Sequence, residues 1–519
     1  MKILYIANIR LPTEKAHGVQ IMTMCEAFAR LGHTVELVVP DRYTPITEDP
    51  FSYYGVEHAF TITRLPTFDT VSWGRAGFWL QTLSFIINAA RYARRSSADV
   101  IYSRDPALFF FGRMPPGKTL VWEIHTRPTP RVAEKIRKSR VRIVAISSGL
   151  RAVLIEAGVP RERIMVAHDA VDADMFAQVP DRQTVRRELS LPEDKKLVAY
   201  IGKYKTMGES KGVEEVISTV GAVHAHHADV GLLIVGLNQD ELSEVRSLIS
   251  AAGLEDAAYL VRHVAHDQVA RYMRAADMLV MNYPKIERYA RFMSPLKLFE
   301  YMASGTSIIT SDLPSIREVL NDTTAYFFKA DDGADFRRVL EETLANPTAA
   351  SERARAALEE VKERTWQKRA EHIVSFFESI PSIHTPRKTF MEYRMMVRYV
   401  ISGGSGAAVQ FASFYLLNEI LRIWYLYAVF LSFIVALCVV FLMQKFWTFR
   451  SFSRSLFRRE FLSYTAIAIL GVLLNMSLMY IMVDLFRMRP IVSQALVIIA
   501  VTPVSYFLNK TITFAPRAA

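Results

Sequence analysis

A stretch in the second half of the chain combines residue types that could bind a phosphorylated ligand. It begins Ser294-Pro295-Leu296, and its first turns also carry Lys297 and Glu300. A Ser-Pro step is typical of a helix start, where free backbone N–H groups and the positive end of the helix dipole favour a phosphate. The pattern therefore predicts a site for a ligand such as a nucleoside diphosphate.

Two lysines earlier in the chain, Lys203 and Lys211, flank a polar loop that follows an apolar run at residues 197–201. Ammonium groups at the end of a strand suit a pyrophosphate, because they can meet the negative charge that grows on a departing phosphate. We predict that both lysines stabilise a diphosphate leaving group. The alternative is a pair of solvated surface lysines.

Three residues of the first domain could also belong to a site. His125 and Arg104 each follow a strand-like run, and ligands of open α/β sheets bind outside the carboxyl ends of strands. Gly18 lies at a predicted helix start, in a loop that lacks the full glycine fingerprint of dinucleotide-binding folds. Arg104 could contact the acceptor or a lipid. The alternatives for the other two are a structural histidine and a glycine needed only for its turn.

The segment at residues 294–305 resembles the donor-site signature of retaining GT-B glycosyltransferases of the family-4 type, and roughly the first 380 residues fit that pattern. The resemblance implies that Glu300 binds the ribose of a sugar nucleotide and that His125 faces the donor sugar. It also implies that Gly18 lets the backbone approach the diphosphate, and it supports the leaving-group role of Lys203 and Lys211.

The sequence departs from this family at one position. Many members carry a second glutamate eight residues before the ribose-binding one, but this chain has Phe292 there, and Glu287 is too far upstream to replace it. Which residue holds the donor sugar is therefore left open.

Asp172-Ala173-Asp174 spells a motif that chelates a divalent metal in another glycosyltransferase class. Here it precedes Phe176 and resembles a hinge-region pattern of GT-B enzymes, so we interpret it as structural. We expect neither a metal nor a cofactor; the nucleotide sugar enters as a substrate.

Composition predicts a soluble part joined to a membrane part. The 519 residues are 51% hydrophobic yet 22% charged, and the two cysteines, Cys25 and Cys438, are not spaced for a metal or a disulfide framework. The net charge is +11, of which residues 391–519 contribute +8, from 12 Lys and Arg against 4 Asp and Glu. Because the basic excess lies in an apolar tail, anionic lipid is favoured as a partner over nucleic acid.

The first 380 residues alternate strand-like runs with helical patterns, as doubly wound sheets require. Strands are predicted at residues 2–7, 34–39, 100–102, 119–124, 141–146, 163–166, 197–201, 231–235, 259–261, 278–281 and 307–310, and further helices at 336–346 and 353–380. We expect a GT-B fold of two Rossmann-like α/β domains, residues 1–185 and 186–380. A linker at 381–396 then leads to an all-α transmembrane domain at 397–519.

The tail contains four apolar spans, near residues 399–417, 424–443, 461–483 and 491–508, each long enough for a bilayer helix. Many of its residues recur at an offset of 65: Tyr399/Tyr464, Gly406/Gly471, Gln410/Asn475, Gln444/Asn509, Lys445/Lys510, Thr448/Thr513 and Phe449/Phe514. The tail is therefore predicted to be a duplicated helix pair with parallel halves.

The Phe-Leu-x-Gln-Lys-x-x-Thr-Phe ending of the second span resembles GtrA-like proteins, which are associated with moving polyprenyl-linked sugars across membranes. Gln410 and Asn475 lie mid-span and could be functional or could only join helices. Lys445 and Lys510 could bind a lipid phosphate or could only extend to the headgroups. The domain could also mediate oligomerisation.

Lysine and arginine are concentrated beside one set of span ends, which predicts a multi-pass inner-membrane protein with both termini in the cytoplasm. Two stretches of the first domain are also rich in basic residues. Residues 73–95 mix them with aromatic residues, and residues 127–142 carry seven basic residues against one acidic residue, Glu134. Both stretches suggest contact with an anionic membrane surface. The alternative is that the first is an ordinary core-facing helix and the second a solvated face.

Together these features predict a metal-independent, retaining glycosyltransferase. It would pass a sugar from a nucleotide-diphosphate donor to a lipid-linked acceptor at the cytoplasmic face, with a tail that anchors it and helps the product cross. The alternative is a lipid-linked-sugar translocase whose front half only binds sugar nucleotide.

Overall fold

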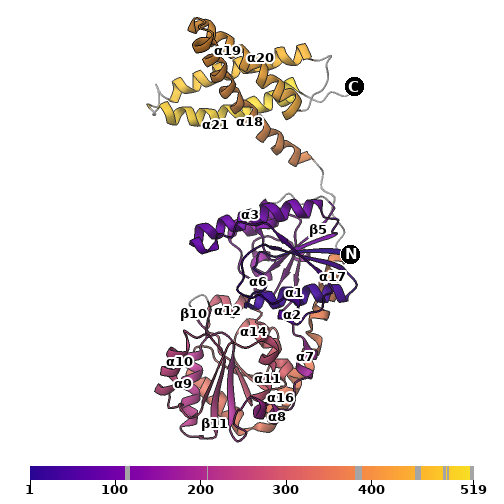
Figure 1. The fold of residues 1–519 in the computed structure, drawn as a ribbon, viewed down its shortest axis with the longest axis vertical. Helices are drawn as coiled ribbons and strands as arrows, with labels where there is room; N and C mark the ends of the chain where they lie inside the picture. Colours follow the sequence, from indigo (N-terminus) through magenta and orange to yellow (C-terminus); the bar gives the residue numbers. More distant parts are fainter. Residues whose placement is uncertain are drawn as a thin grey trace. The chain divides into compact units, whose positions relative to one another are not determined.

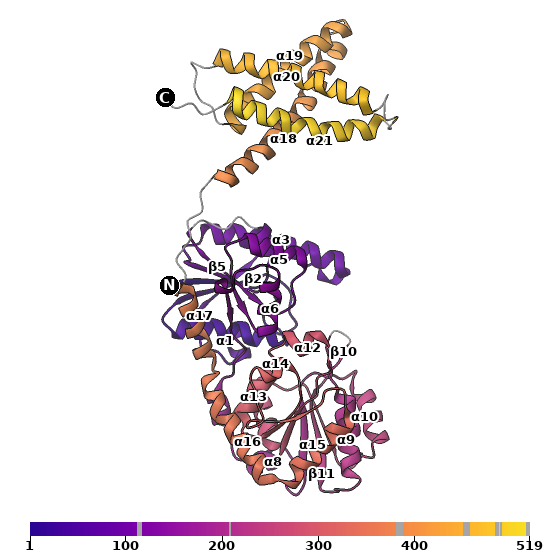
Figure 2. The ribbon, with the colours of Figure 1, turned by 180° about the vertical axis from the view of Figure 1, so that it is seen from behind.

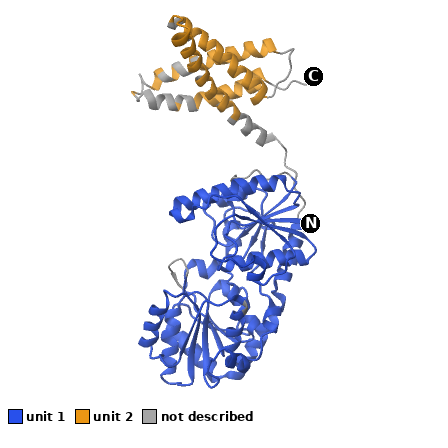
Figure 3. Ribbon diagram, in the orientation of Figure 1, with its two compact units in different colours: residues 1–383 blue, residues 384–519 orange. Residues whose placement is uncertain are grey.

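The computed structural model describes residues 1–111, 117–206, 209–379, 388–449, 457–482, 487 and 490–514. The chain divides into two compact units, Met1–Ile383 and His384–Ala519, coloured separately in Figure 3. Each unit is considered by itself below.

The first unit begins with a seven-stranded parallel sheet in the order β3-β2-β1-β4-β5-β6-β7. Its strands are β1 (Lys2–Ile6), β2 (Thr34–Pro40), β3 (Thr61–Leu65), β4 (Val100–Ser103), β5 (Thr119–Ile124), β6 (Arg142–Ala145) and β7 (Ile164–Val166). The strands from β4 to β6 are almost wholly buried, because helices cover both faces of a parallel sheet.

The two faces of this sheet have separate cores. One face packs Ile3 and Tyr5 against α1 (Ala16–Arg30) and α17 (Trp366–Ser379). The other face carries α3 (Gly74–Arg95), α4 (Ala107–Phe111), α5 (Pro130–Lys138) and α6 (Ser148–Glu156). This division follows from right-handed crossovers, since the chain reverses its direction across the sheet after β3. A short helix, α2 (Pro50–Tyr54), packs beside α1.

The second sheet has six strands in the order β12-β11-β8-β13-β14-β15, all parallel. They are β8 (Lys196–Ile201), β11 (Val230–Leu237), β12 (Ala258–Arg262), β13 (Met278–Met281), β14 (Ser307–Ser311) and β15 (Tyr326–Phe328). A small antiparallel pair, β9 (Lys205–Thr206) and β10 (Glu209–Ser210), follows β8.

The helices around this sheet are α8 (Arg182–Glu188), α9 (Val213–His224), α10 (Leu242–Ala251), α11 (His266–Ala275), α12 (Glu287–Phe292), α13 (Leu296–Ser304), α14 (Pro314–Arg317), α15 (Gly333–Ala345) and α16 (Pro347–Glu360). The short α7 (Ala173–Ala177) leads from the first sheet to α8. Figures 1 and 2 show the two α/β halves of the first unit from opposite sides.

The end of the unit differs from the prediction of helix over 353–380. The helix is interrupted between α16 and α17, where the N–H of Val171 donates to the carbonyl of Arg364 over 3.1 Å and Val171 bridges to Thr365. This pairing between the segments that join the two halves lets α17 return to the first sheet. There Trp366, Ile373 and Phe377 enter the core beside α1.

The second unit is helical in its described residues: α18 (Lys388–Tyr415), α19 (Tyr425–Leu442), α20 (Phe457–Tyr480) and α21 (Pro490–Leu508). Short π-helical segments extend these helices at Leu416–Ile420, Met443–Thr448 and Asn509–Thr513. Within the described residues, one helical stretch, Phe430–Thr448, is long and apolar enough to cross a membrane, with a mean hydropathy of 2.0.

Residues at the repeated positions of the two halves meet inside this unit. The rings of Phe449 and Phe514 stack with centroids 4.7 Å apart, and the amide of Asn509 donates to Tyr399 Oη over 3.1 Å. The repeated positions therefore include core contacts between the two halves of the unit.

Candidate functional site

Three lysines from separate elements converge in the second half of the first unit. Lys203 follows β8, Lys211 precedes α9, and Lys297 lies in the first turn of α13. Burial and, to a smaller extent, the charges of Lys203 and Arg288 together lower the pKa of Lys211 to about 8. Burial also holds the pKa of Lys297 well below its usual value, and Lys211 adds to this effect. Clustered cations of this kind are stabilised when an anion enters among them.

The surroundings of Lys297 fix its ammonium group. Its Nζ lies 4.4 Å from the ring centroid of Tyr200 and 4.8 Å from that of Tyr283, as in cation–π contacts. Gly202 has a φ of +142°, and a Cβ built there would lie 3.9 Å from Lys297 Nζ. The loop that carries Lys203 thus passes close to the start of α13.

The residues that open α13 also join the two halves of the unit. Ser294 is buried, and its Oγ accepts a hydrogen bond from the backbone N–H of Asp169 over 2.8 Å. Leu296 packs against the core of the first sheet. Pro295 occupies the N-cap position with extended backbone. Ser294 and Leu296 therefore have structural contacts in addition to any role toward a ligand.

Glu300 lies one turn further along α13 and is held by a residue that the sequence analysis missed. His266 Nε2, at the start of α11, lies 2.8 Å from Glu300 Oε1. The Glu300 side chain is 13% exposed, which leaves part of the carboxylate accessible. Nothing in the local pattern around His266 indicates this pairing, because the two residues are 34 positions apart.

His125 belongs to a buried network centred on Glu123 of β5. His125 Nε2 lies 2.6 Å from Glu123 Oε1, and Arg369 of α17 lies 3.4 Å from the same oxygen. Gln20 Nε2 and Tyr102 Oη also donate to this carboxylate. Burial alone would raise the pKa of Glu123, but Arg369 and His125 outweigh it and hold that pKa well below its usual value.

Burial, more than this network, determines the protonation state of His125. Burial lowers the pKa of His125 to about 4, with Arg104 acting in the same direction and Glu123 opposing. The ring is therefore neutral near pH 7, and its Nε2–H donates to Glu123. The sequence contained one signal for the network, an acidic residue inside the otherwise apolar strand Thr119–Ile124.

Arg104 and Gly18 occupy the same region. Arg104 Nη1 donates to Gln20 Oε1 over 2.6 Å, so Arg104 joins the outer edge of the network. A Cβ at Gly18 would lie 2.2 Å from Tyr54 Oη. Close packing against Tyr54 therefore accounts for the glycine, and Gly18 lies inside α1 rather than in the preceding loop.

The lysine cluster faces the loop before α1. Burial would raise the pKa of Glu14, but its own backbone N–H, Arg10 and Lys203 lower it below its usual value. Lys203 thus acts electrostatically on a residue of the first half. Arg127 pairs with both oxygens of Glu287 across the same junction, each over 2.9 Å.

The structure explains the phenylalanine that replaces the expected glutamate. Phe292 ends α12 and is 5% exposed, in a core cluster with Trp122 and Ile124 of the first half. Glu287 is paired with Arg127. Neither position carries a free carboxylate toward the lysine cluster.

Asp172 has a structural role in the described geometry. Its side chain caps α7 by accepting hydrogen bonds from the N–H groups of Asp174 and Met175 over 3.1 and 3.2 Å. This arrangement agrees with the interpretation of the motif as a hinge element.

Three family models match successive parts of the chain. They are Glycosyltransferase Family 4 at residues 17–175, Glycosyl transferases group 1 at residues 181–363, and the GtrA/DPMS transmembrane domain at residues 398–514. The chain joins a two-domain glycosyltransferase unit to a GtrA/DPMS transmembrane domain. The predicted fusion is thereby confirmed.

The glycosyltransferase unit is similar to curated proteins over part of their length. It is 24% identical over 262 residues to a D-inositol 3-phosphate glycosyltransferase of an Arthrobacter species, covering 49% of this chain and 60% of the relative. It is 27% identical over 213 residues to a phosphatidyl-myo-inositol mannosyltransferase of Mycobacterium leprae, covering 41% and 54%. The chain thus spans between half and two thirds of the length of these relatives.

Solved structures show the fold of the glycosyltransferase unit. Anabaena HepE in complex with UDP has a TM-score of 0.57 at 14% identity, covering 73% of this chain and all of that chain. Sucrose-phosphate synthase of Thermosynechococcus elongatus has a TM-score of 0.58 at 17% identity, covering 73% and 98%. Two Rossmann-like domains in the GT-B arrangement are therefore confirmed.

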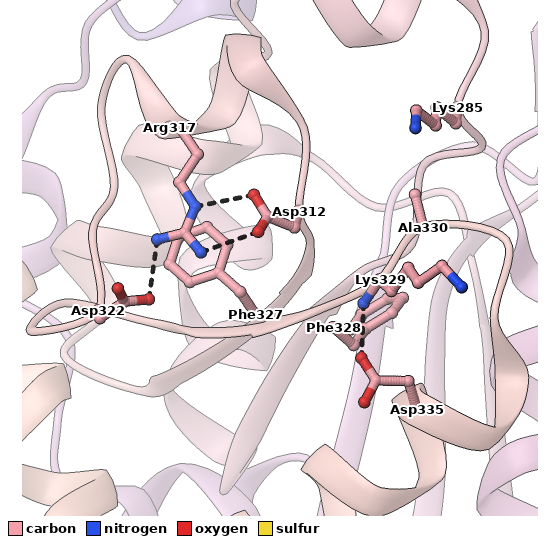
Figure 4. A pocket seen from close by; sticks show the side chains of 9 residues that line it. All are labelled: Lys285, Asp312, Arg317, Asp322, Phe327, Phe328, Lys329, Ala330 and Asp335. Atoms are coloured by element: carbon pink, nitrogen blue, oxygen red, sulfur yellow. Dashed lines mark hydrogen bonds and ion pairs between the residues drawn. The ribbon is translucent and has the colours of Figure 1, made fainter.

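A separate pocket lies at the β15 end of the second sheet (Figure 4). Its charged groups are largely paired with one another: Arg317 binds Asp312 and Asp322 over 2.8 Å, and the Lys329 N–H donates to Asp335. It contains none of the predicted site residues.

In the GtrA/DPMS domain, Lys445 is 1% exposed and forms an ion pair with Glu460 inside the helical bundle. An extension of Lys445 to the headgroups is therefore wrong, because its ammonium group points toward a buried carboxylate. Lys510 lies in the π-helical end Asn509–Thr513 and is partly buried. Gln410 is partly buried on α18; Asn475 lies on α20, and its side chain is outside the described residues.

Proposed function

We propose that the chain is a membrane-bound, retaining glycosyltransferase. It transfers a sugar from a nucleotide-diphosphate sugar to a lipid-linked acceptor at the cytoplasmic face of the membrane. The observation that carries the proposal is the convergence of Lys203, Lys211 and Lys297 beside Glu300 in the group 1 domain. Three cations at one end of a sheet suit a diphosphate, and the adjacent carboxylate suits a ribose.

In this proposal the lysines act mainly after bond breaking begins. Negative charge on the β-phosphate grows as the bond to the sugar breaks, so the lysines bind the transition state more tightly than the donor. His125, at the carboxyl end of β5, is held neutral by burial and oriented by its hydrogen bond to Glu123. Phe292 and Glu287 do not bind the sugar hydroxyls in this proposal, since Phe292 is in a core cluster and Glu287 is paired with Arg127.

The comparisons support a nucleotide sugar and a lipid acceptor. HepE was crystallised with UDP and with UDP-glucose. The Mycobacterium leprae relative is named for transfer to phosphatidyl-myo-inositol. The match to the GtrA/DPMS transmembrane domain supports a membrane location and also favours a second candidate function, translocation of a lipid-linked sugar without transfer.

Donor consumption separates the two functions. The purified full chain would be incubated in lipid nanodiscs with membrane lipid extract and a panel of UDP-, GDP- and dTDP-sugars. Released nucleoside diphosphate and lipid products would be followed by mass spectrometry, and the anomeric configuration of the product by NMR. We expect one donor to be consumed with retention, and activity to survive EDTA.

A matched pair of variants tests the site. Lys211→Met should abolish turnover, whereas Lys205→Met should not, because Lys205 lies on the same loop but is paired with Glu244 over 2.7 Å. If the folded parent consumes no donor of the panel, the transferase proposal fails and translocation takes its place.

A further inference from the structure

The outer face of α3 has an unusual composition for a helix on the surface of an α/β domain. Its inner face packs Phe85, Ile86 and Ala89 on the first sheet. Its outer face repeats at spacings of three and four residues, so that its members form one stripe along the helix: Ala76, Leu80, Leu83, Ile87, Arg91 and Arg94. The first two thirds of this stripe are apolar and the end is basic.

Large apolar side chains are exposed along this stripe and at the start of the helix. Trp73 is 70% exposed, Trp79 65%, Leu83 46% and Ile87 40%. A surface helix normally presents polar residues to water, and a contiguous apolar stripe marks an interaction surface. Figures 1 and 2 show α3 on the outside of the first sheet, with one end reaching beyond it.

A second, basic surface lies in the same helical layer. α5 is covered by exposed Arg131, Lys135, Arg137 and Lys138, and the single acidic residue of this helix, Glu134, is paired with Lys138 over 2.6 Å. α3 and α5 lie on the same face of the sheet, because Leu4 contacts α3 and Trp122 contacts α5 from the side opposite α1 and α17. The layer therefore combines tryptophans, aliphatic side chains and a net positive charge.

We infer that the α3–α5 layer, defined as residues 73–95 and 130–138, docks on an anionic lipid bilayer. Tryptophan and arginine side chains suit the headgroup region, where the rings contact acyl chains and the guanidinium groups meet lipid phosphates. The charge of the layer is complementary to an anionic membrane, whereas two copies of a basic surface repel each other. The GtrA/DPMS domain keeps the layer near a bilayer, so a weak affinity suffices for docking.

The inference concerns membrane contact by the glycosyltransferase unit itself and does not rest on the proposed activity. It is tested with the full chain in nanodiscs, carrying an environment-sensitive fluorophore on Leu83→Cys. Cys438 is replaced by serine in this protein so that it does not react with the fluorophore, whereas Cys25 is buried and can remain. A matched label goes on Glu371→Cys, which is exposed on α17 at the opposite face of the same sheet.

Nanodiscs of phosphatidylcholine with phosphatidylglycerol are compared with pure phosphatidylcholine. We expect lipids with a spin label in the acyl chain to quench the Leu83 fluorophore in the anionic discs and the Glu371 fluorophore in neither. Each basic residue near an anionic surface is worth roughly fivefold in binding. Arg91→Glu with Arg94→Glu removes two such residues and adds two repelled negative charges, so it should lower the ratio of docked to undocked protein by at least about 25-fold. The charge-matched control Arg246→Glu with Arg262→Glu should leave the ratio unchanged.

Two results would overturn the inference. One is a Leu83 label that stays unquenched in anionic discs while circular dichroism shows a folded chain. The other is protection of this label from aqueous iodide in detergent micelles without lipid. Protection that depends on protein concentration would show that the surface binds a second copy of the chain. Protection that does not depend on concentration would show that it binds the helical unit. Donor turnover is measured in parallel, so that a failed transferase proposal and a failed docking proposal remain distinguishable.

Discussion

Raising the pH is predicted to weaken diphosphate binding to the lysine cluster, because Lys211 loses its charge within an accessible range. Its pKa is lowered to about 8 by burial and by Lys203 and Arg288. The protonated form is therefore present below pH 8 and is lost as the pH rises through 8. With this pKa the lysine is about 91% protonated at pH 7 and about 9% at pH 9, a loss of roughly tenfold in the binding-competent form.

The assay is isothermal titration calorimetry with UDP and GDP as probes between pH 7 and 9. The dissociation constant should rise about tenfold or more, because the pKa of Lys297 is lowered in the same direction. Binding should also take up protons near pH 8, which two buffers of different ionisation enthalpy would reveal, since the anion favours the charged lysine.

Lys211→Arg supplies the control. A guanidinium stays charged throughout this range, so the variant should lose most of the pH dependence while it still binds the probe. A parent affinity that is constant from pH 7 to 9, or a Lys211→Arg variant with the same pH profile as the parent, would refute the assignment of Lys211 to the phosphate site.

Three further changes test other parts of the molecule. Glu300→Ala should cost about 1.5–3 kcal/mol in UDP binding, the value of a hydrogen bond to a charged group, and no loss should occur with 2′,3′-dideoxy-UDP if the ribose is the partner. Glu123→Gln should lower the free energy of unfolding in urea by about 3–5 kcal/mol, because it leaves Arg369 buried without its carboxylate; a loss below about 1 kcal/mol would contradict the network. Lys445→Gln should destabilise the helical unit in thermal unfolding, and Glu460→Gln in the same chain should restore much of the loss; two additive effects would show that the pair is not coupled.

The central strands were predictable from sequence because both faces of a parallel sheet are buried. Val-, Ile- and Leu-rich runs such as residues 278–281 and 307–310 became β13 and β14 with at most one residue of difference at an end. The edge strand β3 was missed, because its residues are mostly exposed or only partly buried and its sequence, Thr-Ile-Thr-Arg-Leu, shows no continuous apolar run. β15 was missed because three residues give too short a pattern.

The lysine cluster was predictable for a different reason. Lys203 and Lys297 follow or begin elements whose ends meet at one edge of a parallel sheet, so local patterns were enough to bring them together. The partners of Glu123 were not predictable in this way. Arg369 lies 246 positions later in the sequence, on α17. This helix packs on the first sheet only because the chain breaks its helical path between α16 and α17, and the sequence pattern did not indicate that break.

The 65-residue repeat of the helical unit does not by itself show that Lys445 and Lys510 have the same role. Lys445 and Lys510 are equivalent by the 65-residue offset, but the partner of Lys445, Glu460, corresponds to Met395 (460 − 65 = 395). The ion pair therefore belongs to one half only, whereas the stacked pair Phe449 and Phe514 joins equivalent residues of both halves. Packing between the halves is enough to preserve a repeated motif, so the recurrence of a lysine does not by itself imply two equivalent phosphate ligands. If a lipid phosphate is bound by this unit, Lys445 can contribute only by exchanging its buried carboxylate for the phosphate, and the Lys445 and Glu460 variants measure the cost of that exchange.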